Sequence, residues 1–204
     1  MKKILLIIFL LILIAGAYLG WIFLGPGTGF KEDDKFLYIK TDSANKAAIM
    51  TTLKEGKYIH NLKGFQWLAG QMNYWNTIKP GKYKIEKGES MLAIIRRLRN
   101  GQQTPVDLVI TRVRTKENFA RLVANKFEFD SIDMMNFLNN ADSLNNYGVK
   151  PETAMTVVLP NTYTYYWNTT PSKVYQKLYD ESQKFWNDDR KEKASLIHFE
   201  LYRF

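Results

Sequence analysis

The chain has 204 residues, which is enough for one or two small domains that each bury a core. It contains no cysteine, so a disulfide framework and a thiolate metal site are excluded. Its 29 basic residues outnumber 20 acidic ones and give a net charge of +9. That balance favours an anionic neighbourhood, such as a phospholipid surface or an anionic wall polymer, although a solvated basic face without a partner explains it equally well.

Residues 4–24 form an apolar stretch without a charged side chain. As a helix with a rise of about 1.5 Å per residue, the stretch is roughly 30 Å long, the thickness of a bilayer core. Lys2 and Lys3 precede it, and by the positive-inside rule they keep the N-terminus in the cytoplasm. We therefore expect a single-pass inner (plasma) membrane protein whose globular part is periplasmic. A cleaved signal peptide is the alternative, because residues 15–17 resemble a small-x-small cleavage site.

The first part of the globular region alternates strands and helices. Glycine-rich residues 25–29 predict a short linker. Residues 36–39 are a strand candidate, and residues 41–43 carry side chains that can cap a helix beginning near Ala44. A folded α+β region is expected from this point onward.

The same plan of strand and helix follows a second time. Residues 81–85 alternate as a strand, and Ser90 is expected to cap a helix that Gly101 ends. Residues 105–110 then return as a strand.

The remainder of the chain is predicted to be mostly helical. Thr115 opens one helix and Ser131 caps another. Thr170 and Pro171 supply an N-cap and a first-turn proline, so a long helix is expected to run from there to about Lys193.

The two histidines give no indication of a metal site. His60 and His198 lie far from each other and from any acidic or cysteine cluster with ligand spacing. We therefore predict no metal and no cofactor.

Four aromatic residues gather beside a proline in residues 159–170, and they point to carbohydrate. Tyr163, Tyr165, Tyr166 and Trp167 combine flat apolar faces with polar edges, the kind of surface on which sugar rings stack. Filling a core is the alternative for each of them. Asn161 and Tyr163 are candidates for orienting a sugar, but their side chains would equally well hold the turn through bonds to the backbone. Asn161, Tyr163, Tyr166 and Trp167 are therefore the predicted substrate-binding residues.

The motif Leu-Pro-Asn-Thr-Tyr at residues 159–163, continued by Tyr-Trp-Asn-Thr at 166–169 and by residues 174–193, resembles the endolytic murein transglycosylases of the YceG-like (MltG) family. The resemblance implies a lyase that cleaves peptidoglycan glycan strands to 1,6-anhydro-muramic ends. It also implies one carboxylic acid that keeps its proton in a desolvated pocket, with no second carboxylate. Residues 79–111 resemble the LysM-like subdomain of these proteins, which implies binding of glycans that contain N-acetylglucosamine.

One departure from the family concerns the acid itself. The family's catalytic glutamate lies in an Ala-Ser-Ile-Val/Ile-Glu type motif on a following helix, and no residue here matches it. We expect that glutamate to lie beyond the chain end and the chain to be inactive through truncation, for which a premature stop or frameshift is our hypothesis. Glu200 is the one acid in residues 195–204. Its apolar neighbours would raise its pKa if it were buried, but a terminal segment is usually held too loosely to exclude water.

These observations predict an α+β protein in three parts. The parts are a transmembrane anchor with linker at residues 1–29, a LysM-like subdomain at 30–111, and the mostly helical start of an incomplete catalytic domain at 112–204. Expected partners are peptidoglycan glycan strands, the membrane through residues 4–24, and cell-wall synthesis proteins. Nucleic acid is not expected, because the anchor places the basic part outside the cytoplasm. A membrane-tethered peptidoglycan-binding module and a scaffold without catalysis are the alternatives.

Overall fold

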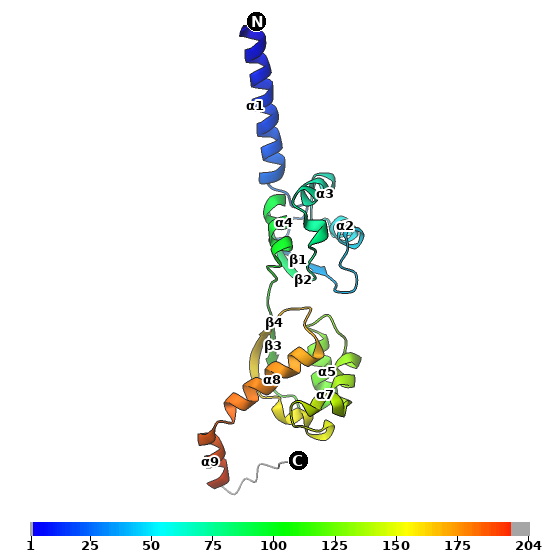
Figure 1. The fold of residues 1–204 in the computed structure, drawn as a ribbon, viewed down its shortest axis with the longest axis vertical. Helices are drawn as coiled ribbons and strands as arrows, with labels where there is room; N and C mark the ends of the chain where they lie inside the picture. The colour runs from blue at the N-terminus through cyan, green and yellow to red at the C-terminus, as the bar shows by residue number, and fades with distance from the viewer. Residues whose placement is uncertain (1, 197–204) are drawn as a thin grey trace. The chain divides into compact units, whose positions relative to one another are not determined.

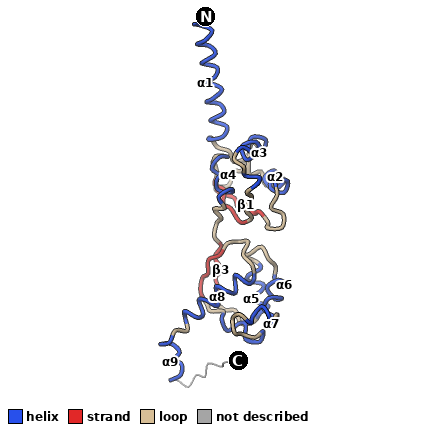
Figure 2. The backbone as a smooth tube through the Cα atoms, in the orientation of Figure 1, coloured by secondary structure: helices blue, strands red, loops and turns tan. Residues whose placement is uncertain are grey.

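The computed structural model describes residues 2–196, and it divides the chain into two compact units, Met1–Thr104 and Pro105–Phe204. Each unit combines helices with one antiparallel pair of strands, an α+β arrangement (Figures 1 and 2). We call them unit 1 and unit 2.

Helix α1 (Lys2–Leu24) forms where the apolar stretch predicts a helix (Figure 1). Its last turn belongs to the folded part of unit 1, because the ring of Phe23 stacks on that of Trp67 with centroids 5.4 Å apart. The backbone N–H of Gly25 donates to the carbonyl of Trp21 at 2.9 Å and closes the helix.

The prediction of a transmembrane helix at residues 4–24 is corrected by the structure. Within residues 2–196, no helix combines the length and the apolar character that crossing a membrane requires. Only the end of the apolar stretch contacts unit 1, through Phe23 and Trp67, while the described large apolar side chains from Ile4 to Ile14 are 49–67% exposed. The predicted single-pass inner-membrane location, with a periplasmic globular part, depended on this helix and is corrected with it.

Unit 1 is built around the strands β1 (Asp34–Ile39) and β2 (Gly81–Glu86). The strands are antiparallel, with Asp34 opposite Glu86 and Ile39 opposite Gly81. Helices α2 (Lys46–Glu55) and α3 (Leu62–Gln71) and the short 3₁₀ helix η1 (Tyr74–Asn76) lie between the strands in sequence, and α4 (Met91–Asn100) follows them.

The core of unit 1 follows from the alternation of its strands and the stripe of its last helix. Leu37 and Ile39 on β1 are buried, and so are Tyr83 and Ile85 on β2, because alternate residues of a strand face the same side. Helix α4 adds the buried residues Met91, Ile94, Ile95 and Leu98. Burial at this spacing is what holds the helix on the sheet.

Three predicted helix ends in unit 1 can be compared with the structure. Ser90 caps α4 as predicted, with its hydroxyl accepting from the N–H of Ala93 at 3.2 Å, and Gly101 ends the helix at φ +70°. The cap predicted at residues 41–43 is wrong. Helix α2 begins at Lys46, and the side chain of Asn45 accepts from the N–H of Ala48 at 3.0 Å.

Unit 2 is built around β3 (Val106–Ile110) and β4 (Asn161–Tyr165), which pair antiparallel with Val106 opposite Tyr165. Its helices are α5 (Lys116–Ala124), α6 (Ser131–Asn139), α7 (Ala141–Asn145), the 3₁₀ helix η2 (Pro151–Val157), α8 (Pro171–Phe185) and α9 (Asp188–Leu196). Alternate residues of both strands, such as Leu108 and Tyr163, enter a core that includes Phe119, Met134 and Leu178 from the helices.

The observed boundary between the two units differs from the predicted one because of β3. This strand falls inside the predicted subdomain at residues 30–111, whereas the structure pairs it with β4 and places the boundary after Thr104. The stretch at residues 79–111 that resembles LysM is therefore divided, with β2 and α4 in unit 1 and β3 in unit 2.

Two of the three predicted helix starts in unit 2 are confirmed, and one predicted start and one predicted helix end are wrong. Thr115 and Thr170 cap α5 and α8 as expected. Helix α6 is capped by Asp130 rather than Ser131, because the backbone of Asp130 is extended and its carboxylate accepts from the N–H groups of Ile132 and Asp133. The helix predicted to reach Lys193 ends at Phe185, and α9 follows it as a separate helix.

Candidate functional site

The predicted substrate-binding segment forms β4 and the turn before it in unit 2. Asn161 is exposed, and its side-chain oxygen accepts from the backbone N–H of Thr162 at 2.8 Å. Tyr163 is buried, and its hydroxyl donates to the carbonyl of Leu159 at 2.9 Å. Burial raises the pKa of Tyr163 above the usual value of a phenol. Both side chains therefore hold the local backbone around Pro160, and their assignment to sugar binding stays a prediction.

The aromatic residues that follow differ in accessibility. Tyr165 is buried, with its hydroxyl donating to the carbonyl of Val174 at 3.1 Å. Trp167 is half-buried against the core of unit 2, and its backbone carbonyl accepts from the N–H of Glu128 at 2.9 Å. Tyr166 is 55% exposed. Of these three rings, Tyr166 therefore presents the most open face to a ligand.

Among the ion-paired carboxylates of the described residues, Glu89 is the least exposed, and it lacks the setting that a proton donor to a glycosidic oxygen needs. Glu200 lies outside the described residues. Glu89 is enclosed, with a side chain 10% exposed, but its Oε2 accepts from the guanidinium of Arg97 at 2.6 Å and from the N–H of Glu86 at 3.2 Å. An adjacent cation compensates a carboxylate charge, whereas a donor acid requires an apolar pocket that disfavours the charge. Glu89 is therefore a structural ion-pair partner.

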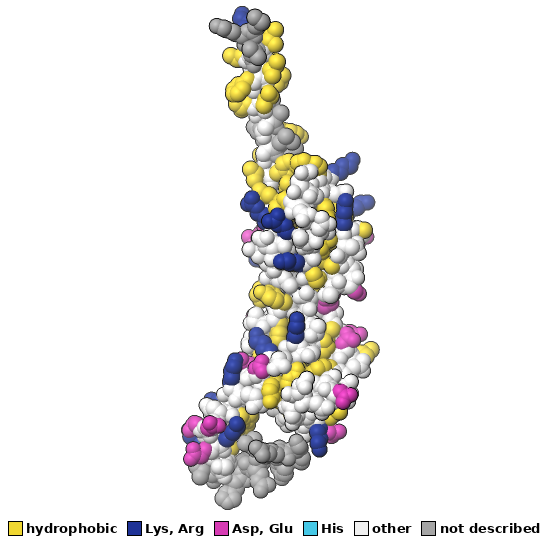
Figure 3. All heavy atoms as spheres, in the orientation of Figure 1, with side chains coloured by type: hydrophobic (Ala, Val, Ile, Leu, Met, Phe, Trp, Pro, Cys, Tyr) yellow, Lys and Arg dark blue, Asp and Glu magenta, His cyan; other side chains and the backbone are white. Residues whose placement is uncertain are grey.

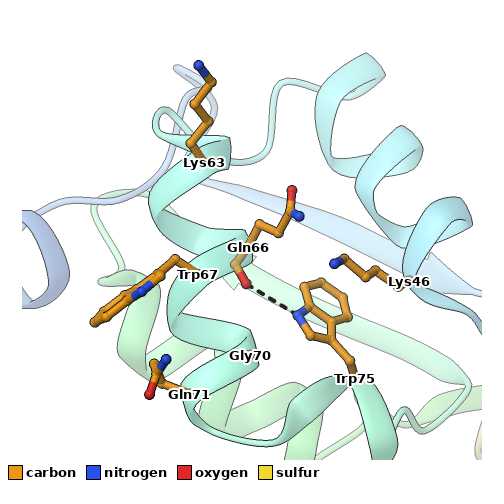
Figure 4. Close-up of a pocket in the computed structure, with 7 residues that line it drawn as sticks. All are labelled: Lys46, Lys63, Gln66, Trp67, Gly70, Gln71 and Trp75. Carbon is orange, nitrogen blue, oxygen red and sulfur yellow. Dashed lines mark hydrogen bonds between the residues drawn. The ribbon is translucent and has the colours of Figure 1, made fainter.

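A groove of about 460 Å³ lies on unit 1, and sequence analysis did not identify it (Figure 4). Most of it is lined by one face of α3, where side chains recur every three or four positions. These residues are Lys63, Gln66, Trp67, Gly70 and Gln71. Lys46 at the start of α2 and Trp75 in η1 complete the lining. The opposite face of α3 buries Phe65 and Ala69 in the core, so packing of the helix fixes the direction of the groove face.

The two tryptophans of the groove are held by different contacts. The indole N–H of Trp75 donates to the carbonyl of Gln66 at 3.2 Å, as the dashed line in Figure 4 shows. The ring of Trp75 also packs against Tyr74, with centroids 5.1 Å apart. Trp67 is 56% exposed, and Phe23 stacks on its ring. The groove therefore has one fixed indole wall and one more open indole.

Gly70 leaves space beside the indole of Trp75, while the ring of Trp67 points to the other side of α3 (Figure 4). A Cβ atom built on Gly70 would lie 3.8 Å from the indole nitrogen of Trp75, an ordinary van der Waals distance. An alanine fits at this helical position, while a longer side chain would extend into the groove. The sequence signal for this site was the presence of Trp67 and Gly70 on the polar face of an amphipathic helix.

Positive charge is concentrated on the unit that carries the groove. Residues 1–104 contain 16 Lys and Arg against 7 Asp and Glu, whereas residues 105–204 contain 13 of each. The net charge of +9 therefore comes from unit 1, and Figure 3 shows dark-blue basic side chains gathered over it. Lys46 and Lys63 bring two of these charges to the groove, and its lining includes no acidic residue.

A metal centre is not formed by the part of the chain that the structure describes. Within residues 2–196, no three His, Cys, Asp or Glu side chains come together as ligands. His60 lies in this part, and His198 lies outside it.

Comparison with known proteins places the chain in a family. The family model of the YceG-like family matches residues 37–204, which is most of the chain. No curated protein matches it. A crystal structure of a yceG-like protein from Listeria monocytogenes aligns at 18% sequence identity with a TM-score of 0.40, covering 81% of this chain and 60% of that one. This chain thus spans less than two thirds of the length of the Listeria protein. The resemblance first seen in residues 159–163 is confirmed over residues 37–204, and the chain belongs to the YceG-like family.

Proposed function

We propose that this protein binds the glycan strands of peptidoglycan and serves their non-hydrolytic cleavage as a murein transglycosylase-type protein. The observation that carries the proposal is the family match over residues 37–204, which includes the motif at 159–163. The groove with Trp67 and Trp75 supports it, because indole faces and amide side chains suit the apolar and polar sides of a pyranose ring.

The reaction of a lytic transglycosylase needs few protein groups. The 6-hydroxyl of the muramyl residue attacks its own anomeric carbon, the glycosidic C–O bond breaks, and a carboxylic acid gives its proton to the leaving oxygen. The carboxylate then takes up the proton of the attacking hydroxyl, so no water is consumed. One acid with a raised pKa is therefore enough. The described residues offer groups for strand binding rather than this acid, and Glu200 is the candidate outside them.

Co-sedimentation with purified, protein-free peptidoglycan tests strand binding. We expect the full chain to sediment with the polymer. A chain that stays in the supernatant would contradict the proposal and would favour the scaffold alternative, which predicts capture of proteins without affinity for glycan.

Mass spectrometry of uncrosslinked glycan strands after incubation with the full chain tests cleavage. Products with 1,6-anhydro ends that disappear in Glu200→Gln would assign the acid to this chain. Binding without such products would restrict the chain to strand recognition.

A further inference from the structure

We infer that the groove of unit 1 is a binding site for an N-acetylated glycan that carries carboxylate groups, and that it prefers such a glycan to a neutral one. This inference rests on the proposed function and adds to it the site, the ligand chemistry and the origin of selectivity. Nothing in the family match identifies these residues.

The groove offers a sugar ring an apolar surface on which to stack. The groove has a volume of about 460 Å³ and is open to solvent, so a sugar ring would lie on its surface rather than be enclosed by it. Trp75 is fixed by its N–H bond to Gln66, so its ring is already oriented before a ligand arrives. Preorganised aromatic walls bind with little loss of conformational entropy. The apolar face of a pyranose ring therefore finds a rigid surface here.

Polar side chains lie beside these rings. Gln66 and Gln71 line the groove, and each side-chain amide can both donate and accept hydrogen bonds. Sugar hydroxyls and an acetamido group need both kinds of partner. A purely apolar peptide or helix would leave these amides facing apolar surface, which costs free energy. The lining thus favours a glycan over an apolar protein segment.

The groove also carries positive charge. Lys46 and Lys63 stand at the groove, and the unit around them supplies the whole net charge of +9. A neutral glycan gains nothing from these ammonium groups, while a carboxylate-bearing one is attracted to them and reaches the groove faster. The ammonium group of Lys46 also lies 5.6 Å from the ring centroid of Trp75. An exposed contact of this kind is worth only about 0.5–1 kcal/mol, so Lys46 is free to turn to an anion.

Two sources of carboxylate occur on peptidoglycan strands, the lactyl group of muramic acid and the stem peptide. Both place an anion beside an N-acetylated pyranose, which is the chemistry that the groove recognises. Calorimetry with strands of each kind distinguishes the two sources.

The test is to titrate the full chain with each of three oligosaccharides of equal length and to measure the binding affinity by calorimetry. The first is a strand freed of its peptides, which exposes the lactyl carboxylates. The second carries stem peptides, and the third is the neutral N-acetylglucosamine oligomer. At low salt we expect the better anionic ligand to bind about tenfold more tightly than the neutral one, and the difference to shrink as salt screens the charges. Equal affinity for anionic and neutral oligomers would overturn the inference.

Variants locate the effect in the groove. The double variant Lys46→Gln and Lys63→Gln is expected to lower anionic binding to the level of the neutral oligomer. Lys54→Gln, which removes an identical charge from α2 outside the groove lining, is its control and should bind unchanged. A loss of the same size in Lys54→Gln would mean that general charge, and no site, attracts the glycan.

A change at Gly70 tests the space itself. Gly70→Leu places a side chain in the groove and should weaken all three oligomers at least about tenfold, because a blocked site loses stacking as well as charge. Gly70→Ala should fold as well as the original chain or slightly better, since alanine is favoured over glycine within a helix. Unchanged binding by Gly70→Leu would remove the groove from consideration. If that variant still sediments with peptidoglycan as the original does, the proposed function stands and this inference alone fails.

Discussion

Buried phenol groups connect distant segments of unit 2 at the scale of single residues. The hydroxyl of Tyr175 on α8 donates to the carbonyl of Ala154 at 2.8 Å, and that of Tyr165 donates to the carbonyl of Val174 at 3.1 Å. Both bonds are buried. A buried carbonyl without a partner is costly, so these hydroxyls stabilise η2 and α8 against each other and against β4.

Tyr175→Phe tests this role. The substitution keeps the ring, whose centroid lies 5.0 Å from that of Tyr147, and removes only the hydroxyl. The carbonyl of Ala154 would then be buried without its donor, so the free energy of unfolding should fall by about 1–3 kcal/mol. Urea denaturation measured by circular dichroism gives this value from the shift of the midpoint at constant slope.

Tyr166→Phe is the matched control for that measurement. It makes the same chemical change on a ring that is 55% exposed, where water replaces any lost bond. Its unfolding free energy should change by less than about 0.5 kcal/mol. Equal losses in the two variants would show that the buried hydroxyl has no special part.

Tyrosines of the predicted site show what residue type alone leaves open. The sequence pattern identified Asn161, Tyr163, Tyr166 and Trp167 as a group, but a tyrosine that stacks on sugar and one that fills a core are the same residue type. On β4, alternation places Tyr163 and Tyr165 on the inward face, where both are buried, and the assignment of Tyr163 to sugar binding stays a prediction. Tyr166 follows after the strand has ended and remains exposed.

At the scale of elements, helix α4 depends on its two ends. The hydroxyl of Ser90 satisfies the N–H of Ala93 at the start, and Gly101 adopts φ +70° at the end. Removing the first should destabilise unit 1 because one N–H group of the first turn loses its acceptor. We expect Ser90→Ala to lower the free energy of unfolding by about 1 kcal/mol.

Hydrogen exchange of the amides in α4 measures that loss locally, and Ser90→Thr is its control. Threonine keeps a hydroxyl that can accept from the same N–H, so protection in α4 should stay near its original level. A loss of protection in Ser90→Thr as large as in Ser90→Ala would contradict a capping role.

Helix caps show which features local side-chain chemistry predicts and which it does not. Ser90, Thr115 and Thr170 were predicted as caps and are caps. Where several residues that can cap a helix follow one another, the type of side chain does not show which of them is the N-cap. Asp130 is chosen over Ser131 because its backbone is extended and the Asp133 side chain completes a capping box with it.

Contacts between distant elements lay beyond the sequence pattern. The groove needs α2, α3 and η1 in one arrangement, and nothing local to Gln66 indicates that the indole of Trp75 lies beside it. Strand β3 was recognised as a strand, but its pairing with β4 skips the helices between them. Pairing of this kind is set by burial of the whole unit rather than by neighbouring residues.

At the scale of the whole molecule, buried tyrosines in both units make stability depend on alkaline pH. Burial raises the pKa of Tyr83 in unit 1 to about 12, and it raises the pKa of Tyr74, Tyr165 and Tyr175 as well. In the unfolded chain a phenol loses its proton near about pH 10. Between about pH 10 and 12 the unfolded chain therefore releases phenol protons that the folded chain keeps. Because the unfolded state then binds fewer protons, the free energy of unfolding falls as the pH rises. Below about pH 10 these groups are neutral in both states and contribute no pH dependence.

We expect the midpoint of urea unfolding to be steady with respect to these phenols below about pH 10 and to decline above it, together with a rise in phenolate absorbance as the protein unfolds. Tyr83→Phe should have a smaller decline, by up to about 2 kcal/mol across this window, because one shifted phenol has been removed. It will also be less stable at neutral pH, since the hydroxyl of Tyr83 donates to the carbonyl of Lys79 at 2.8 Å. The slope with pH, rather than the stability itself, is therefore the measurement that decides. An unchanged slope in Tyr83→Phe would show that the folded protein does not hold this proton.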